Sequence, residues 1–348
     1  MLHAQLRRIS PRARSSLSWA GSPKRTFGSY NSGEALARVP VLRPTLWALG
    51  AISTIYFGCA AYDVCRDVWD AKRQGAFSEG RVGTYEELEY TKLRSDGRHF
   101  ASRTSSSSSS RSSSSKWLPT GQLGEMFAKF NESEKLILGV SALNIGLTGA
   151  SYFAPGSFMQ HFSHIPVYSP NYTLLTSAFG HSGLLHVALN TFMLIQLAPN
   201  VAQSHVFQAN GSHLAAFYLS AGILSSLGDH LATLLPTRKY RYNRFAASLG
   251  SSGVAFAMIG AFAMLHPDAQ MGIMFLPGSY SMESFIVGLA LFDAFGLFVG
   301  IPFLRFAHGA HLAGLAVGSA YVYYDGEKHI WRPTRRFAFH SMKRLRMI

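Results

Sequence analysis

The stretch Gly250-Ser251-Ser252-Gly253 opens an apolar segment that continues from Val254 to Leu265. Glycine carries no side chain, so it lets other backbone approach closely and leaves a neighbouring hydroxyl exposed. A serine between glycines at the start of an apolar helix is therefore a candidate nucleophile. The tetrapeptide alone is weak evidence, because runs of glycine and serine also form ordinary turns and helix-packing contacts.

A second stretch, Ala310-His311-Leu312-Ala313-Gly314, supplies a base for this serine. A serine hydroxyl is a poor nucleophile unless a neighbouring base takes its proton, and His311 is the best candidate for that base. A histidine inside a membrane span is costly, which favours function over a role as a buried packing residue. Small residues on both segments would let the two helices approach closely. They are Gly253, Ala257 and Ala261 on one segment and Ala310, Gly314 and Gly318 on the other.

A third stretch contains His181, His186 and Asn190. Acyl transfer places negative charge on an oxygen atom, and that charge needs fixed hydrogen-bond donors. His186 and Asn190 are four residues apart and therefore share one face of a helix. We expect these two side chains, with the Ser252 backbone N–H, to stabilise the oxyanion. Accessory roles are expected for His181 and for the flanking Gly250 and Gly253.

Other kinds of site fit the sequence less well. No carboxylate or cysteine joins the histidines at a ligand spacing such as HExxH, so we predict no metal and no other cofactor. The histidines in question are His181, His186, His308 and His311. The Gly-x-Ser-x-Gly elbow of α/β-hydrolases is not matched, because a glycine directly follows Ser252. No acid occupies a clear third position of a triad. Asp293 could orient a neighbouring group or act in packing, and structural pairing is the favoured role for both Asp229 and Asp293.

Composition indicates a membrane protein. The 348 residues are 48% hydrophobic and only 14% charged, whereas soluble domains carry about 25% charged residues. Backbone in hydrocarbon must satisfy its own hydrogen bonds, so the apolar runs should be helices. We therefore predict an all-α polytopic membrane protein with a six-helix core and one extra N-terminal transmembrane helix. The seven runs are 44–62, 136–154, 183–203, 213–235, 251–265, 282–300 and 308–324.

The rest of the chain is polar. Residues 1–43 hold eight Lys or Arg residues and one acid, an Arg-rich and Ser-rich composition typical of a mitochondrial transit peptide. Residues 63–133 form a polar linker, with a short helix expected at 85–93 and a serine tract at 105–115 that cannot bury a core. The core then covers 134–325, and 326–348 is a basic tail. The net charge of +14 favours contact with a membrane surface over nucleic-acid binding.

Three motifs in this order resemble those of the rhomboid intramembrane serine proteases. Phe179 to Asn190 is similar to their second-helix signature, Gly250 to Gly253 to their Gly-x-Ser-Gly, and Ala310 to Gly314 to their histidine helix. The resemblance covers about residues 134–325 and the first span. Tyr218 to Gly222, Phe275 to Pro277 and the extra span further resemble the mitochondrial, presenilin-associated branch of that family.

The resemblance implies a serine endopeptidase of the mitochondrial inner membrane, with Ser252 as nucleophile and His311 as base. Its partners would be the lipid bilayer and single-span membrane substrates. Two departures stand out: the loop 157–180 lacks the Trp-Arg pair of many bacterial members, and Phe256 replaces a tyrosine. An inactive rhomboid-like protein that binds membrane clients is the alternative. A transporter would be expected to show internal repeats, and none is seen. The oligomeric state and the side that the site faces stay open.

Overall fold

The computed structural model describes residues 38–75, 77, 83–94, 130–236, 243–272, 278–301 and 306–348. The first 37 residues of the expected transit peptide, the serine tract 105–115 and Phe275 to Pro277 lie outside the described residues, as does most of the basic loop 237–244. All contacts given below belong to one compact unit, Val39–Ile348.

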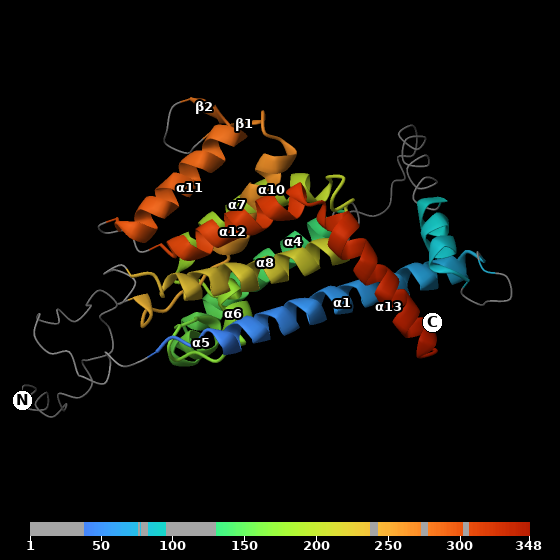
Figure 1. The fold of residues 1–348 in the computed structure, drawn as a ribbon, viewed down its shortest axis with the longest axis horizontal. Coiled ribbons are helices and arrows are strands. Elements are labelled where there is room, and N and C mark those ends of the chain that lie inside the picture. Colours follow the sequence, from blue (N-terminus) through green and yellow to red (C-terminus); the bar gives the residue numbers. More distant parts are fainter. Residues whose placement is uncertain are drawn as a thin grey trace, which may run out of the picture. The chain divides into compact units, whose positions relative to one another are not determined.

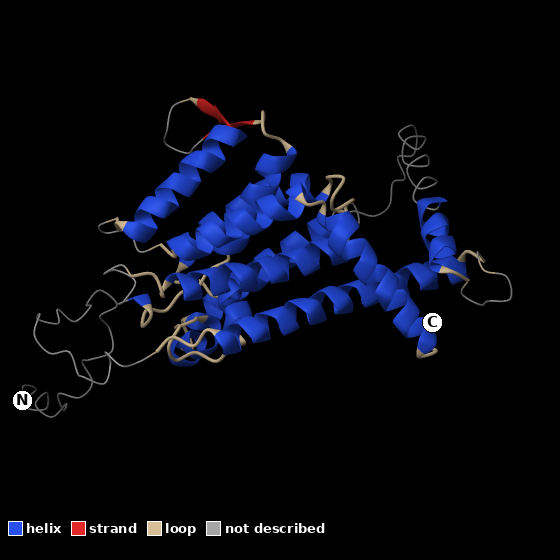
Figure 2. Cartoon of the chain, in the orientation of Figure 1, coloured by secondary structure: helices blue, strands red, loops and turns tan. Residues whose placement is uncertain are grey.

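The described residues are mostly helical (Figure 2). The helices are α1 (Leu42–Arg73), α4 (Glu132–Ser151), α5 (Pro155–Phe162), α6 (Thr173–Thr176), η4 (Ser177–Phe179), α7 (Leu184–Ala202), α8 (Gly211–Ala232), α10 (Ser252–Leu265), α11 (Met282–Phe298), α12 (His308–Tyr323), η5 (Glu327–Trp331) and α13 (Arg332–Arg344). Two short strands, β1 (Gln270–Gly272) and β2 (Ser279–Ser281), pair antiparallel with Met271 opposite Tyr280.

Helices occupy all seven predicted apolar runs. Two of them, Leu42–Arg73 and Leu184–Ala202, are long and apolar enough to cross a membrane, judged by length and composition among the described residues. The number of spans in the core therefore stays a prediction. Helix starts follow local capping chemistry. Asn131 and Glu134 form a reciprocal capping box on α4, while Asn210 and Ser281 accept backbone N–H groups at the starts of α8 and α11.

Helix α8 lies at the centre of the packing. It contacts α1, α4, α10 and α12 (Figure 1). Its fully buried side chains include Tyr218, Phe217 and Leu214. Among the described residues, α10 and α12 form the most extensive contact between helices. A Cβ at Gly314 or Gly318 would overlap the carbonyl oxygens of Gly253 and Ala257 on α10. The small faces predicted on these two helices therefore meet, and they bring the two backbones into direct contact.

The C-terminal stretch 326–348, expected as a basic tail, forms η5 and α13. Helix α1 also extends eleven residues beyond the predicted run, and this extension carries Asp63 and Asp67, which pair with α13. Arg335 of α13 is 4% exposed; its guanidinium pairs with Asp63, with Asp67 at 2.8 Å and with Glu89 at 2.8 Å. Buried charges need such partners. The predicted helix at 85–93 is present as residues 85–94 and supplies Glu89.

Candidate active site

Ser252 is the first residue of α10, and His311 lies in the first turn of α12. The His311 Nε2 atom is 3.1 Å from Ser252 Oγ, which is hydrogen-bond distance. The turn before α10 is held in place by the Gly250 N–H, which donates to the Ser177 carbonyl at 2.9 Å. Ser252 opens its helix, so its own backbone N–H has no acceptor within α10. The two residues expected to form a nucleophile and a base thus come together from different helices.

The His311 ring is held from two directions. Phe256, one turn after Ser252, stacks on it with ring centroids 4.0 Å apart and an interplanar angle of 12°. On its other edge, His311 Nδ1 is 3.1 Å from Asp293 Oδ1 of α11. A carboxylate oxygen is an acceptor, so Nδ1 carries the hydrogen and Nε2 is free to accept from the Ser252 hydroxyl. This tautomer is the one that a general base requires.

Ser251 pairs with a different histidine. His181 Nε2 is 3.1 Å from Ser251 Oγ and also accepts the Ser251 backbone N–H at 3.3 Å. Burial, with the neighbouring His186, lowers the pKa of His181 to about 4, so its ring is neutral near pH 7. Ser251 is completely buried, whereas Ser252 is partly exposed. The Ser251–His181 pair is therefore closed to a substrate.

His186 faces the same space as Ser252. Its Nδ1 accepts the Ser182 backbone N–H at 3.3 Å and lies 3.1 Å from Ser182 Oγ. In the neutral ring the hydrogen must then be on Nε2. A Cβ placed on Gly250 would lie 2.9 Å from that Nε2 and 3.8 Å from Ser252 Oγ. Gly250 thus leaves open the space between an N–H donor and the candidate nucleophile.

Asn190 is buried on the same helix as His186. Its Nδ2 atom donates to the His186 carbonyl at 3.0 Å, and its Oδ1 atom has no hydrogen-bond partner among the described residues. The amide is therefore bound to the backbone of its own helix, and the expected oxyanion role of Asn190 stays a prediction.

A small cavity of about 20 Å³ adjoins Ser252 and Gly253. Hydroxyl groups dominate its polar lining, from Ser177, Ser225, Ser226 and Ser248. A cavity needs roughly 10–15 Å³ and two to four polar partners to hold a water molecule. This cavity has room for about one.

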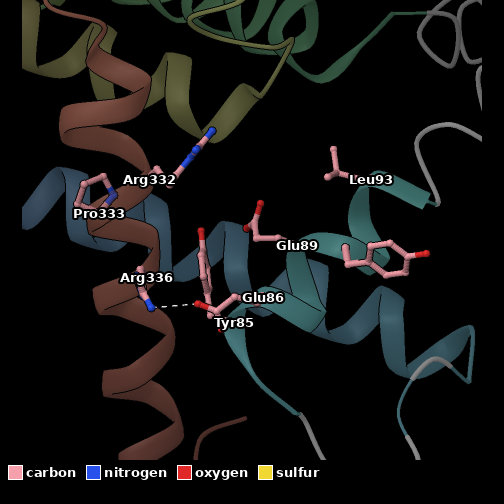
Figure 3. Close-up of a pocket in the computed structure, with 8 residues that line it drawn as sticks. Tyr85, Glu86, Glu89, Leu93, Arg332, Pro333 and Arg336 are labelled. Atoms are coloured by element: carbon pink, nitrogen blue, oxygen red, sulfur yellow. Dashed lines mark hydrogen bonds and ion pairs between the residues drawn. The ribbon is translucent and has the colours of Figure 1, made fainter.

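A much larger cavity of about 500 Å³ lies between residues 85–94 and α13. Tyr85, Glu86 and Glu89 face Arg332, Pro333 and Arg336 there (Figure 3). Arg336 pairs with Glu86 at 3.0 Å. None of the predicted site residues lines this cavity, and its polar groups are largely engaged in ion pairs. The candidate pair Ser252 and His311 lies instead at the α10–α12 contact.

The sequence allowed Asp293 to orient a neighbour but did not indicate the histidines of α12 as its partners. Asp293 Oδ1 is also 2.6 Å from His308 Nδ1. Within the described residues, Asp293, His308 and His311 are the one group of at least three potential metal ligands whose donor atoms lie close together, within 4.8 Å. The aspartate is on another helix, 15 and 18 residues away in sequence, so no short motif could reveal it.

Comparison with known proteins agrees with this geometry. The family model for the rhomboid domain matches residues 169–328. The chain contains a rhomboid domain. Every predicted site residue lies inside this domain, which confirms the family resemblance drawn from the motifs. The domain begins within the loop that precedes α6 and ends in η5.

The rhomboid domain has mitochondrial relatives. The chain is 27% identical over 223 residues to the presenilin-associated rhomboid-like protein, mitochondrial, of Homo sapiens, covering 61% of this chain and 53% of the relative. It is 27% identical over 213 residues to presenilin-associated rhomboid-like protein A, mitochondrial, of Danio rerio, covering 60% and 52%. Rhomboid protein 1, mitochondrial, of Saccharomyces cerevisiae is 26% identical over 153 residues, covering 44% and 41%. The chain thus spans about half the length of the curated relatives it matches.

Proposed function

We propose that this chain is an intramembrane serine protease that cleaves transmembrane segments of mitochondrial inner-membrane proteins. The observation that carries the proposal is the 3.1 Å separation of His311 Nε2 and Ser252 Oγ, with the His311 ring stacked on Phe256. The rhomboid domain gives this pair a context in which serine proteolysis is an established activity of family members. The names of the relatives support a mitochondrial location.

The geometry fits acyl transfer step by step. Ser252 Oγ attacks the scissile carbonyl carbon, and His311 Nε2 takes the hydroxyl proton. Negative charge develops on the carbonyl oxygen, next to the His186 Nε2–H and the Ser252 backbone N–H. His311 then delivers the proton to the leaving amine, and an acyl-enzyme forms. Hydrolysis needs one water molecule, for which the serine-lined cavity beside Ser252 has room.

Reconstitution tests the proposal directly. The full chain in liposomes should cleave a single-span substrate, and Ser252→Ala and His311→Ala should each abolish cleavage. Ser251→Ala is the matched control, because the neighbouring hydroxyl bonds to His181 instead and its loss should leave substantial activity. A fluorophosphonate probe should label the wild type and Ser251→Ala but not Ser252→Ala.

The outcome also separates protease from client-binding protein. An inert wild type that captures single-span proteins in the same liposomes would support the inactive rhomboid-like alternative. Labelling at Ser251 would overturn the assignment of the nucleophile. Location has its own assay: residues 1–43 fused to a soluble reporter should carry it into mitochondria, and a reporter that stays cytosolic would refute the targeting hypothesis.

A further inference from the structure

We infer that Asp293 is a positioning residue for His311, which makes the site a Ser-His-Asp arrangement rather than a two-residue pair. The inference rests on the proposed protease function and deepens it. Four atoms define the line: Ser252 Oγ, the two ring nitrogens of His311, and Asp293 Oδ1. Both contacts of the imidazole are 3.1 Å long.

Asp293 is built into the contact between α11 and α12. Its side chain is 1% exposed, and its Oδ1 atom faces both His311 and His308, which lie one turn apart on α12. Gly296, one turn after Asp293, makes this possible, because a Cβ there would overlap the His308 ring. The spacing on each helix thus brings one carboxylate oxygen to two imidazole rings.

The hydrogen positions follow from this arrangement. An oxygen that lies within hydrogen-bond distance of two ring nitrogens accepts from both, so His308 and His311 each carry a hydrogen on Nδ1. His308 is completely buried, and its Nε2 has no hydrogen-bond partner among the described residues. Its Nδ1–H bond to Asp293 is therefore the hydrogen bond that holds this ring. The same bond holds the Asp293 carboxylate in place, and the carboxylate in turn orients His311.

A metal ion is the competing explanation for the same three side chains. Zinc binds nitrogen and oxygen at about 2.0–2.1 Å in a tetrahedron, which separates neighbouring ligand atoms by roughly 3.3 Å. The Asp293 Oδ1 to His308 Nδ1 distance is 2.6 Å, too short for two ligands of one ion and normal for a charge-assisted hydrogen bond. His311 Nε2 lies at hydrogen-bond distance from Ser252 Oγ, as expected of a general base. The geometry therefore favours hydrogen bonding.

The aspartate contributes when charge develops. As the Ser252 Oγ–H bond breaks and the new bond to the carbonyl carbon forms, the proton moves to His311 Nε2 and the ring becomes an imidazolium. Its Nδ1–H then faces the Asp293 carboxylate in a buried setting, where such a bond is stronger than in water. The carboxylate does not take the proton. It holds the ring in the reactive tautomer and stabilises its positive charge.

The test compares Asp293→Asn with Glu283→Gln, which makes the same change from acid to amide at an exposed position on the same helix. Measured quantities are the rate of fluorophosphonate labelling of Ser252, kcat and KM for a single-span substrate, and thermal unfolding. We expect Asp293→Asn to lower kcat and the labelling rate by 10²-fold to 10⁴-fold, on the order seen when a triad aspartate is lost. KM and the unfolding temperature should change little, and Glu283→Gln should behave as wild type.

A second measurement holds even if Asp293→Asn does not fold. The ¹⁵N spectrum of histidine-labelled wild type should show a His311 signal, identified by its loss in His311→Ala, with hydrogen on Nδ1. A signal with hydrogen on Nε2 would overturn the inference.

The two hypotheses can fail separately. Equal rates of labelling at Ser252 in the wild type and in Asp293→Asn would refute the positioning role. They would leave the proposed protease function standing. A wild type that is never labelled refutes the protease, while the tautomer of His311 still reports on Asp293. Loss of wild-type activity on chelation, with recovery on addition of Zn²⁺, would replace the positioning role by a metal site.

Discussion

Replacing Gly250 with alanine tests the space in which negative charge is expected to develop. Gly250 has φ of +132°, and a side chain in such a conformation costs on the order of 1–3 kcal/mol. The new Cβ would lie 2.8 Å from His186 Cε1 and 2.9 Å from Nε2, whereas ordinary contacts begin at 3.4 Å. The His186 ring must therefore move by roughly half an ångström or more in a tightly packed site.

That displacement has a predictable kinetic effect. Loss of one oxyanion donor costs on the order of 10²-fold in kcat, or about 2.7 kcal/mol. We expect Gly250→Ala to lower kcat by about that factor, while KM changes by less than about threefold, since the donor acts mainly in the transition state. The free energy of unfolding should fall by about 1–3 kcal/mol from backbone strain.

The assay is cleavage of a single-span substrate in liposomes, with thermal unfolding measured on the same preparation. Gly146→Ala on α4 is the matched control, because its Cβ would meet nothing within 4 Å. A glycine-to-alanine change at such a site should raise stability by about 0.4–1 kcal/mol and leave kcat unchanged. If Gly250→Ala kept the wild-type kcat, the hypothesis that the oxyanion develops in the space beside Gly250 and His186 would be refuted. A fall in stability alone would limit Gly250 to a backbone role.

Three further predictions follow from named contacts. Arg335→Met should lower the free energy of unfolding by about 3–5 kcal/mol, because it leaves buried carboxylates unpaired. Arg336→Met removes an exposed ion pair and should lower it by less than about 1 kcal/mol. Chemical unfolding of both variants measures the difference. Burial and the neighbouring His230 lower the pKa of His164 to about 3. The unfolded chain therefore binds this proton first, and stability should fall as pH drops from about 6.5 towards 3. In His164→Asn, the melting temperature should depend less on pH between 7 and 4.5. Asn190→Ala should lower kcat on the order of 10²-fold; a raised KM with normal kcat would make Asn190 a packing or substrate-binding residue.

Local sequence was enough to predict the helices and the main pair of the site. The seven apolar runs are continuous, so a simple pattern of hydrophobicity locates the helices within a few residues, apart from the eleven-residue extension of α1. The contact between Ser252 and His311 was predictable because each helix has one face of small residues, and two such faces allow close packing. Both features depend on properties that are visible within about twenty residues of chain.

Features that depend on distant partners were not predictable in the same way. The end of α1 has the composition of a polar linker, and nothing in it indicates that Asp63 pairs with Arg335, 272 residues away. The C-terminal stretch reads as a basic tail for the same reason, although it forms α13. Asp293 was recognised as an intramembrane acid, but nothing in its own helix indicates which histidine it will meet. In each case a charge looks unpaired in sequence and is paired only by the fold.

Helix α12 links stability and chemistry in this molecule. Gly314 and Gly318 allow α12 to pack directly against α10. On the same helix, His311 lies at hydrogen-bond distance from Ser252 and Asp293. Hydrogen-bond lengths lie within about 2.7–3.2 Å, whereas two packed helices tolerate larger shifts before they separate. Separating α10 from α12 by a fraction of an ångström should therefore reduce catalysis well before it unfolds the chain. If the proposed protease function holds, the small residues between these helices are as important to the candidate active site as Ser252 and His311.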